Sequence, residues 1–202
     1  SDFTVKVRLQ DGVWHTLSSY LIKVDEVRDT RHYVENASMA IFDFTGKVEV
    51  AVTYNLGEVQ TAKVRPLSYD IPFQIDGNTV TFTLEHPRNL SVEVNGDIFH
   101  NFHLFTGSPE RTIPDKDNPE VIYFGPGIHT VKNGELRVPS GKTVYLAGGA
   151  VLMGRVLIEN VHDVKLLGRG IIDHSIKGGI RIANSRDVYV EGIVATQCAT
   201  GG

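Results

Sequence analysis

The strongest constraint on the fold is a short motif that occurs three times in the second half of the chain. The copies read VYLAGGAVL from Val144, VKLLGRGII from Val164 and VYVEGIVAT from Val188, so the motif repeats after 20 and then 24 residues. A period of this length without helical spacing indicates a solenoid, and short β-branched strands make it a β-solenoid. The repeats therefore predict a parallel β-helix over residues 121–202.

Aligning the three copies places apolar residues and glycines at equivalent positions. The predicted sets are Val144, Val164 and Val188; Leu146, Leu166 and Val190; Gly148, Gly168 and Gly192; Leu136, Val156 and Ile180; and Val138, Ile158 and Ile182. One coil cannot bury such an apolar side alone, whereas stacked coils bury it between neighbours. Glycine permits a sharp corner, and Asn160 and Asn184 predict a stack of asparagines at another corner, their amides bonding turn backbone.

Residues 1–110 consist instead of short alternating strands separated by turn residues. Hairpins are predicted around three glycine-containing turns, Thr45-Gly46, Asp76-Gly77-Asn78 and Asn95-Gly96-Asp97, because tight hairpin turns require positive φ angles. In the run TVTFTL, Val80, Phe82 and Leu84 alternate with threonines, which is the period of a half-buried strand. Several such hairpins predict an antiparallel β-sandwich. A polar linker over residues 111–120 separates it from the β-helix, and the fold class is all-β.

Composition excludes several functional classes. The net charge is −4 and the basic residues are scattered, which gives no electrostatic reason to expect nucleic acid as a partner. No apolar run is long enough to span a membrane. Cys198 is the single cysteine, so a disulfide within the chain and a cysteine metal cluster are both excluded.

The first half offers few candidates for chemistry. His100 and His103 are three residues apart, which places them on opposite faces of a strand and argues against a shared metal ion. His15, His32 and His86 have no acidic partner at a recognisable spacing. Trp14 fits a sugar-stacking platform, but a lone tryptophan is more often a core residue. We therefore expect neither a cofactor nor a metal site.

Three stretches of the second half resemble the opening coils of polygalacturonase-like glycoside hydrolases (family 28 type, pectin lyase-like superfamily). They are YFGPGIHTV from Tyr123, the run VYLAGGAVLMGRVLIENVHDVKLLGRGIID from Val144, and IRIANSRDVYVEGIVA from Ile180. Residues 64–97 resemble the β-sandwich that precedes the helix in some bacterial members. Dextranases and isopullulanases share this two-part plan and a similar opening. The resemblance implies a right-handed β-helix and a polysaccharide substrate, such as pectin or a related glycan.

The resemblance also implies inverting hydrolysis, in which one carboxylic acid protonates the leaving oxygen and a second carboxylate activates water. The family's Asn-Thr-Asp, Asp-Asp, Gly-His-Gly and Arg-Ile-Lys motifs are absent, and Arg181-Ile182-Ala183 is the nearest fragment. No catalytic residue can therefore be assigned, and the chain is predicted to be inactive alone. Asp173, Asp163 and Asp187 are interpreted as turn residues.

Three cations, Arg169, Lys177 and Arg181, are candidate ligands for uronate carboxylates, although exposed cations on a solvated face are equally consistent with the pattern. The last coil has no recognisable cap, which predicts either a longer enzyme carrying the catalytic aspartates or self-association through this end. By the resemblance, the protein is secreted or periplasmic.

Three alternatives remain beside the polygalacturonase-like hydrolase. One is a non-catalytic module for carbohydrate binding or oligomerisation. The second is a dextranase- or isopullulanase-like α-glucan hydrolase, and the third is a calcium-dependent lyase. The lyase would need clustered carboxylates for Ca²⁺, which the coils do not show.

Overall fold

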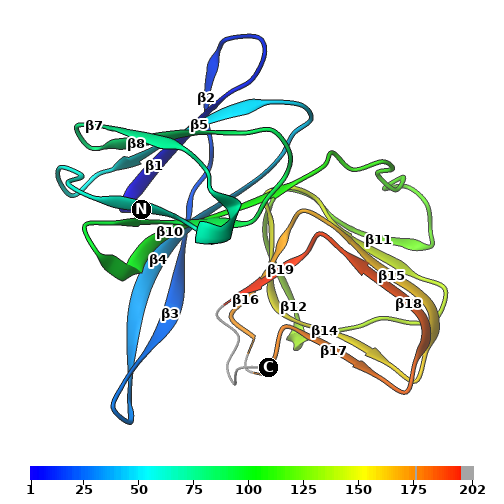
Figure 1. Ribbon diagram of the computed structural model, residues 1–202. Helices are drawn as coiled ribbons and strands as arrows, with labels where there is room; N and C mark the ends of the chain where they lie inside the picture. The colour runs from blue at the N-terminus through cyan, green and yellow to red at the C-terminus, as the bar shows by residue number, and fades with distance from the viewer. Residues whose placement is uncertain (176, 197–202) are drawn as a thin grey trace. The chain divides into compact units, whose positions relative to one another are not determined.

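The computed structural model describes residues 1–175 and 177–196, and the chain forms two compact units, residues 1–109 and residues from 110 onward. Apart from a single 3-10 turn, η1 (Leu67–Tyr69), the regular elements are all strands (Figure 1). Within the described residues no helix is long and apolar enough to span a membrane. Cys198 lies outside them.

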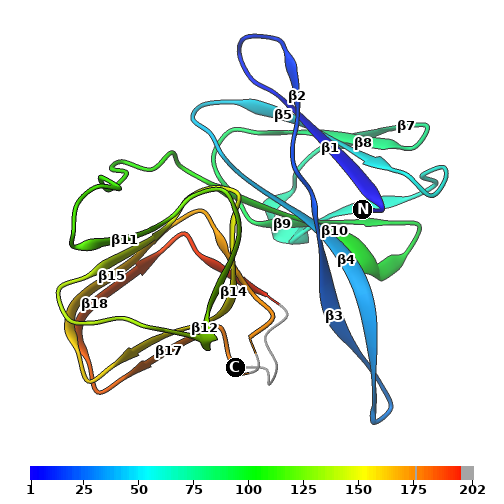
Figure 2. The ribbon, with the colours of Figure 1, turned by 180° about the vertical axis from the view of Figure 1, so that it is seen from behind.

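The first unit is a sandwich of two five-stranded sheets. The first sheet has the order β2-β1-β5-β8-β7, with β1 (Phe3–Arg8), β2 (Trp14–Thr16), β5 (Val48–Tyr54), β7 (Phe73–Asp76) and β8 (Thr79–Leu84). The second has the order β3-β4-β10-β9-β6, with β3 (Tyr20–Arg28), β4 (Arg31–Asp43), β6 (Ala62–Arg65), β9 (Leu90–Val94) and β10 (Asp97–Gly107). Figure 2 shows the long β3–β4 hairpin from behind.

Alternating side chains of both sheets form the core of the sandwich. Val80, Phe82 and Leu84 are buried as their spacing predicted, and they join residues of β1, β5, β9 and β10 in one apolar cluster. Full burial of a side chain of this size stabilises the fold by roughly 1.5–3 kcal/mol. Burial of this shared cluster therefore holds the two sheets packed face to face.

Two of the three predicted hairpins are confirmed. β7 and β8 pair across Gly77-Asn78, and β9 and β10 pair across Asn95-Gly96, where both turn residues have positive φ angles (53° and 79°). The hairpin predicted around Thr45-Gly46 is wrong, because β4 and β5 belong to different sheets.

The reason is that β4 finds other partners. It pairs with β3 and, in parallel, with β10, while β5 pairs with β1 and β8. Phe44 is buried where the chain crosses between the sheets, and its N–H donates to the Gly107 carbonyl (3.0 Å). β5 alternates between buried and half-buried residues, whereas four consecutive residues of β4 are buried, and neither pattern specifies the neighbouring strand.

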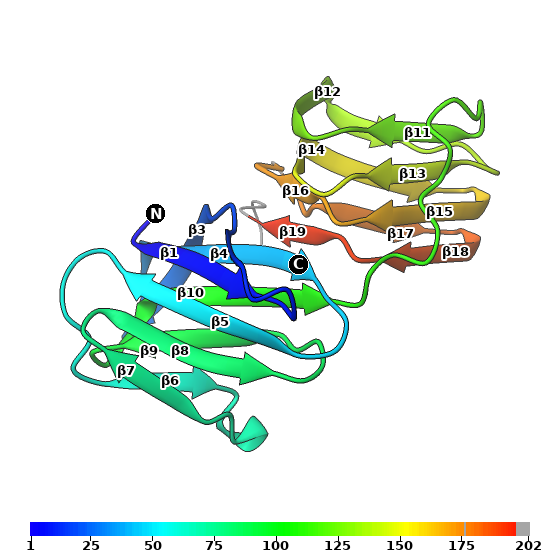
Figure 3. The same ribbon diagram turned by 90° about the horizontal axis from the view of Figure 1, so that it is seen from above.

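The second unit is a parallel β-solenoid. One sheet stacks β11 (Val121–Phe124), β13 (Thr143–Leu146), β15 (His162–Gly168) and β18 (Arg186–Glu191). The other stacks β12 (Gly127–Arg137), β14 (Ala150–Glu159), β16 (Ile171–Asp173) and β19 (Val194–Thr196), and β17 (Ile180–Ala183) also pairs with β14. Figure 3 shows these coils one above another.

The second solenoid sheet is bent. The β12–β14 register shifts between Thr130 and Glu135, so that β16 pairs with the first half of β14 and β17 with its second half. At the bend Gly154 has a φ of 139°, and a Cβ there would lie 2.6 Å from the Gly134 carbonyl oxygen. Each coil consequently has three sides, which Figure 1 shows along the solenoid.

The stacked coils enclose an apolar interior, as the repeat predicted. Val144, Leu146, Val156, Ile158 and Leu166 have no exposed surface. The upstream alignment is confirmed, since Leu136 pairs with Val156 and Ile158 with Ile182. Val164 and Leu166 pair with Val188 and Val190, also as predicted.

The alignment of the first two copies is wrong by two residues. Val144 pairs with Leu166 and Leu146 with Gly168, in place of Val164 and Leu166. Paired residues are 20 apart at Arg137–Leu157, 22 apart along β13–β15, and 20 apart again at Val151–Ile171. One corner of the later coil thus holds two more residues than its counterpart, and the next corner holds two fewer.

At the corner after β14 and the equivalent corner after β17, an asparagine takes a backbone conformation that most residues disfavour. Asn160 and Asn184 have φ angles of 56° and 49°, a left-handed conformation that asparagine tolerates. Serine hydroxyls satisfy the neighbouring N–H groups, since Ser140 Oγ accepts from His162 N–H (3.0 Å) and Ser185 Oγ from Val161 N–H (3.2 Å). Asn160 and Asn184 directly follow the paired residues Glu159 and Ala183, so they occupy equivalent corner positions, and the stack of their side chains stays a prediction.

Gly168 is a position where only glycine fits. It has a φ of 124°, and a Cβ would lie 1.9 Å from the Leu146 carbonyl oxygen of the coil beside it. Gly127 has a φ of 120° but no atom within 4 Å of such a Cβ. An alanine at either position would strain the backbone, but only an alanine at Gly168 would also collide with a neighbouring coil.

We expect Gly168→Ala to lower the free energy of unfolding by about 1–3 kcal/mol more than Gly127→Ala, because only Gly168 faces a backbone oxygen. Urea unfolding of both variants measures the difference. Equal destabilisation would contradict the close coil packing at Leu146.

Candidate functional site

The outward surface of β12, β14 and β17 carries charged residues in adjacent coils, which we call the charged face: Glu135, Arg137, Arg155, Glu159 and Arg181. On β14, Val156 and Ile158 point into the apolar interior, and alternation turns Arg155 and Glu159 outward. Parallel register then places charges from neighbouring coils side by side, with Glu135 directly opposite Arg155.

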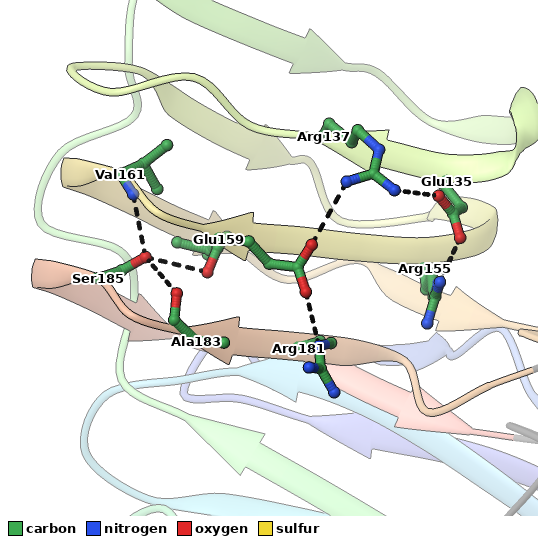
Figure 4. Close-up of polar contacts among 9 residues, drawn as sticks. Glu135, Arg137, Arg155, Glu159, Val161, Arg181, Ala183 and Ser185 are labelled. Carbon is green, nitrogen blue, oxygen red and sulfur yellow. Dashed lines mark hydrogen bonds and ion pairs between the residues drawn. The ribbon is translucent and has the colours of Figure 1, made fainter.

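Arginines bridge both carboxylates of the charged face (Figure 4). Glu135 accepts from Arg155 Nε (3.1 Å) and from Arg137 Nη2 (2.9 Å). Glu159 accepts from Arg181 Nε (2.6 Å) and pairs with Arg137 Nη1 (3.3 Å). Arg137 therefore joins the two carboxylates, and the charged face links three successive coils.

These arginines determine what the two carboxylates can do. The hydrogen bond from Arg155 holds the pKa of Glu135 below its ordinary value, and the bond from Arg181 does the same for Glu159. A general acid must carry a proton near the working pH. Neither carboxylate suits that role at neutral pH, and the charged face acts as a connection between coils.

The three predicted cations do not form one cluster. Arg181 belongs to the charged face and is paired with Glu159. Arg169 lies at the corner between β15 and β16, where its Nη1 donates to the Gly168 carbonyl (3.1 Å). Lys177 is exposed in the segment between β16 and β17, and its backbone N–H and carbonyl both bond Ser175 Oγ (3.3 and 2.7 Å).

The aspartates of the coils lie beside basic neighbours in sequence. Asp173 ends β16 and its carboxylate lies 2.7 Å from His174 Nδ1, with His174 in a left-handed conformation. Asp163 and Asp187 are themselves left-handed (φ 54° and 55°), but both lie within strands, β15 and β18, so the prediction that they are turn residues is wrong. Asp163 pairs with His162 (2.7 Å) and Asp187 with Arg186 (3.0 Å).

The histidines of the sandwich do not share a site. His100 lies 2.9 Å from Asp97 Oδ2 and 3.0 Å from Glu35 Oε2, whereas His103 is largely buried and stacks on Phe105. Burial lowers the pKa of His103. Among residues 1–175 and 177–196, no three His, Cys, Asp or Glu side chains gather as a metal site.

Three expectations for the first half are corrected. His15 and His32 do have acidic partners, Asp11 (3.2 Å) and Asp25 (2.6 Å). Asp25 lies seven positions before His32 and reaches it across the β3–β4 hairpin, which sequence spacing could not show. Trp14 is not a core residue, because β2 is a short edge strand exposed throughout, and the Arg8 guanidinium lies 4.8 Å from its ring centroid.

Sequence reasoning missed most of the charged face and a second polar contact. Tyr145 Oη donates to Glu110 Oε2 (2.8 Å), and its ring stacks on Tyr123 of the adjacent coil. Burial, with this bond, raises the pKa of Tyr145. The signal for the charged face was present, because Arg137, Glu159 and Arg181 alternate in sign at intervals of 22 residues.

Comparison with known proteins identifies a similar fold. No family model and no curated protein sequence matches the chain. Among solved structures, Dex49A from Penicillium minioluteum is similar, with a TM-score of 0.72 and 15% sequence identity. The similarity covers 99% of this chain and 55% of Dex49A, so the chain spans about half the length of that protein. At this identity the likeness shows the fold.

The charged face predicts acid sensitivity. Because the folded-state pKa of Glu159 is lowered from 4.5, its contribution to stability is present above that pH and is lost as pH falls through the lowered pKa. We expect the melting temperature of Glu159→Gln to fall less steeply than that of the parent between about pH 5.5 and about pH 3.5. Glu58→Gln, at an exposed carboxylate of the sandwich, is the control and should follow the parent.

His100 predicts a dependence of the opposite sign. The bond to Asp97 raises the His100 pKa above 6.5, so its stabilising contribution is present below about that pH and is lost as pH rises through the raised pKa. We expect the urea midpoint of the parent to decrease between about pH 6 and about pH 8.5 more than that of His100→Asn. The exposed His86→Asn serves as control; matching slopes for the parent and His100→Asn would refute the role of the Asp97–His100–Glu35 contacts.

Proposed function

We propose that this chain is the N-terminal part of a polysaccharide-degrading glycoside hydrolase that acts on an α-glucan. The observation that carries the proposal is the likeness to Dex49A, which extends over both the sandwich and the solenoid. The sequence independently resembles the two-part plan of dextranases and isopullulanases. A β-sandwich followed by a solenoid also occurs with other activities, so the fold supports the enzyme class only together with that resemblance.

The finer alternative is a polygalacturonase, whose substrate is the anionic polymer of pectin. Its sequence support was the resemblance of three solenoid stretches, and three cations were candidate ligands for uronate carboxylates. In the structure Arg181 is paired with Glu159, and Arg169 lies at a different corner from Lys177. The contacts therefore favour a neutral glucan over a uronate polymer.

The catalytic carboxylates of the proposed enzyme are expected outside this chain. Glu135 and Glu159 are bound by arginines, and Asp173 lies against His174. Inverting hydrolysis needs two carboxyl groups about 6.5–9.5 Å apart, one of them protonated. A polymeric substrate of this kind fits a secreted or periplasmic enzyme, and we include that location in the proposal.

A reducing-sugar assay with the protein encoded by the whole gene tests the proposal. We expect hydrolysis of dextran and none of polygalacturonate, whereas residues 1–202 alone should hydrolyse neither. Hydrolysis of polygalacturonate but not of dextran would overturn the α-glucan assignment. Hydrolysis by residues 1–202 alone would show that the catalytic groups lie within this chain.

The second candidate is a non-catalytic module that binds carbohydrate. The observation in its favour is a polar cleft with an exposed aromatic ring on the sandwich. Binding without hydrolysis by the whole-gene product would support this candidate over the enzyme.

A further inference from the structure

A cleft of about 640 Å³ opens on the sandwich where β7 separates from β8. Pairing of the two strands ends at Phe73–Phe82, although β8 itself continues to Leu84. Asp70 has a left-handed backbone (φ 46°), and Pro72 has no N–H to donate to a sheet. The chain therefore leaves the sheet at this point, and the gap lies between residues 69–72 and the outer surface of β5 and β8.

One wall of the cleft presents an aromatic ring in a fixed position. Tyr69 ends the 3-10 turn η1, in which its N–H bonds the Pro66 carbonyl (3.1 Å), and its side chain is 38% exposed. The Arg88 guanidinium lies 4.1 Å from the ring centroid. Thr106 holds Arg88 in turn, through both its backbone N–H (2.6 Å) and its carbonyl (2.7 Å). Thr106 thus anchors the Arg88 backbone, while the Arg88 guanidinium contacts the Tyr69 ring.

The floor of the cleft carries uncharged hydrogen-bonding groups beside Glu49, which lies opposite Thr83. Thr81 and Thr83 alternate with the buried Phe82 and Leu84, so their hydroxyls face away from the core. Gln74 lies opposite Thr81 in the adjacent strand and faces the same side. An aromatic ring beside hydroxyl and amide groups matches a sugar, which has apolar C–H faces and a rim of hydroxyls.

The charges around the cleft select against an acidic sugar. Its lining includes three carboxylates, Glu49, Asp70 and Glu85, against the two cations Lys47 and Arg88. Arg8 binds Glu49 (2.9 Å from Nε) and Arg88 lies over Tyr69, so neither arginine offers a separate site for an anion. A neutral glycan avoids the repulsion that a polyuronate would meet here.

We propose that this cleft binds a neutral glucan chain, with Tyr69 stacking on a sugar ring and Thr81, Thr83 and Gln74 bonding its hydroxyls. The choice of glucan rests on the proposed function, whereas the cleft itself does not. The site would hold the polymer without cleaving it.

Affinity electrophoresis of the whole chain in gels containing dextran tests this proposal. We expect dextran to retard the parent protein, and Tyr69→Ala to weaken binding by about tenfold, which corresponds to about 1.4 kcal/mol. Tyr69→Phe keeps the ring and should bind within about threefold of the parent. Circular dichroism melting of each variant shows whether the sandwich remains folded.

Tyr33 supplies a matched control. It is also 38% exposed and also has an arginine over its ring, Arg28 at 5.2 Å, but it lies on the β3–β4 hairpin and does not line the cleft. Tyr33→Ala should bind dextran as the parent does. Equal losses in Tyr33→Ala and Tyr69→Ala would overturn the assignment to the cleft.

The remaining outcomes also decide the proposal. A folded Tyr69→Ala that binds like the parent, or a parent that dextran does not retard, would overturn it. Tyr69-dependent retardation by polygalacturonate would refute the neutral ligand. The hydrolysis assay with the whole-gene product is independent of all these readouts, so failure of the cleft and failure of the proposed enzyme can be distinguished.

Discussion

Burial of one apolar side by the next coil is the constraint on which the solenoid depends. Val156 and Ile158 are fully buried only because Ile180 and Ile182 stack on one side of them and residues of β12 on the other. Parallel pairing sets the spacing between coils at about 4.8 Å. At that spacing a corner leaves no room for a Cβ beneath a carbonyl, which explains Gly168 and Gly154. The charged face follows from the same stacking, because Arg137, Glu159 and Arg181 belong to successive coils, with Glu159 two residues beyond the Leu157 that pairs with both arginines.

The sequence was sufficient to predict the fold class, the two styles of architecture and many of the buried side chains, although Ile182 and Val190 of the predicted apolar sets are exposed. It was not sufficient to predict register between the first two repeats. Two corners differ in length by two residues in opposite senses, so the 20-residue period is preserved while Val144 pairs with Leu166. Aligning the repeated motifs by sequence cannot detect two changes in corner length that cancel within one coil. The pairing of β4 with β10 was missed for a related reason, since it joins distant segments that share no local turn.

The surfaces were less predictable than the core. Arg181 was identified as a candidate ligand from its chemistry, but its partner Glu159 lies 22 positions away and becomes its neighbour only through stacking. The cleft on the sandwich depends on where β7 stops pairing with β8, and no single residue type predicts that point. Tyr69 is one of seven tyrosines, and its place in the lining of the cleft distinguishes it from Tyr33, which also has an arginine over its ring.

The position of β4 between β3 and β10 has a consequence for synthesis on the ribosome. Ser38 pairs with Phe102, which is 64 residues further along the chain, and Asp43 pairs with Gly107. Until those later residues emerge, one side of β4 offers unpaired N–H and carbonyl groups to any other nascent strand. The second sheet can close only after nearly all of residues 1–109 have been translated, so this stretch of the protein is vulnerable to misassembly for most of the time that it takes to make it.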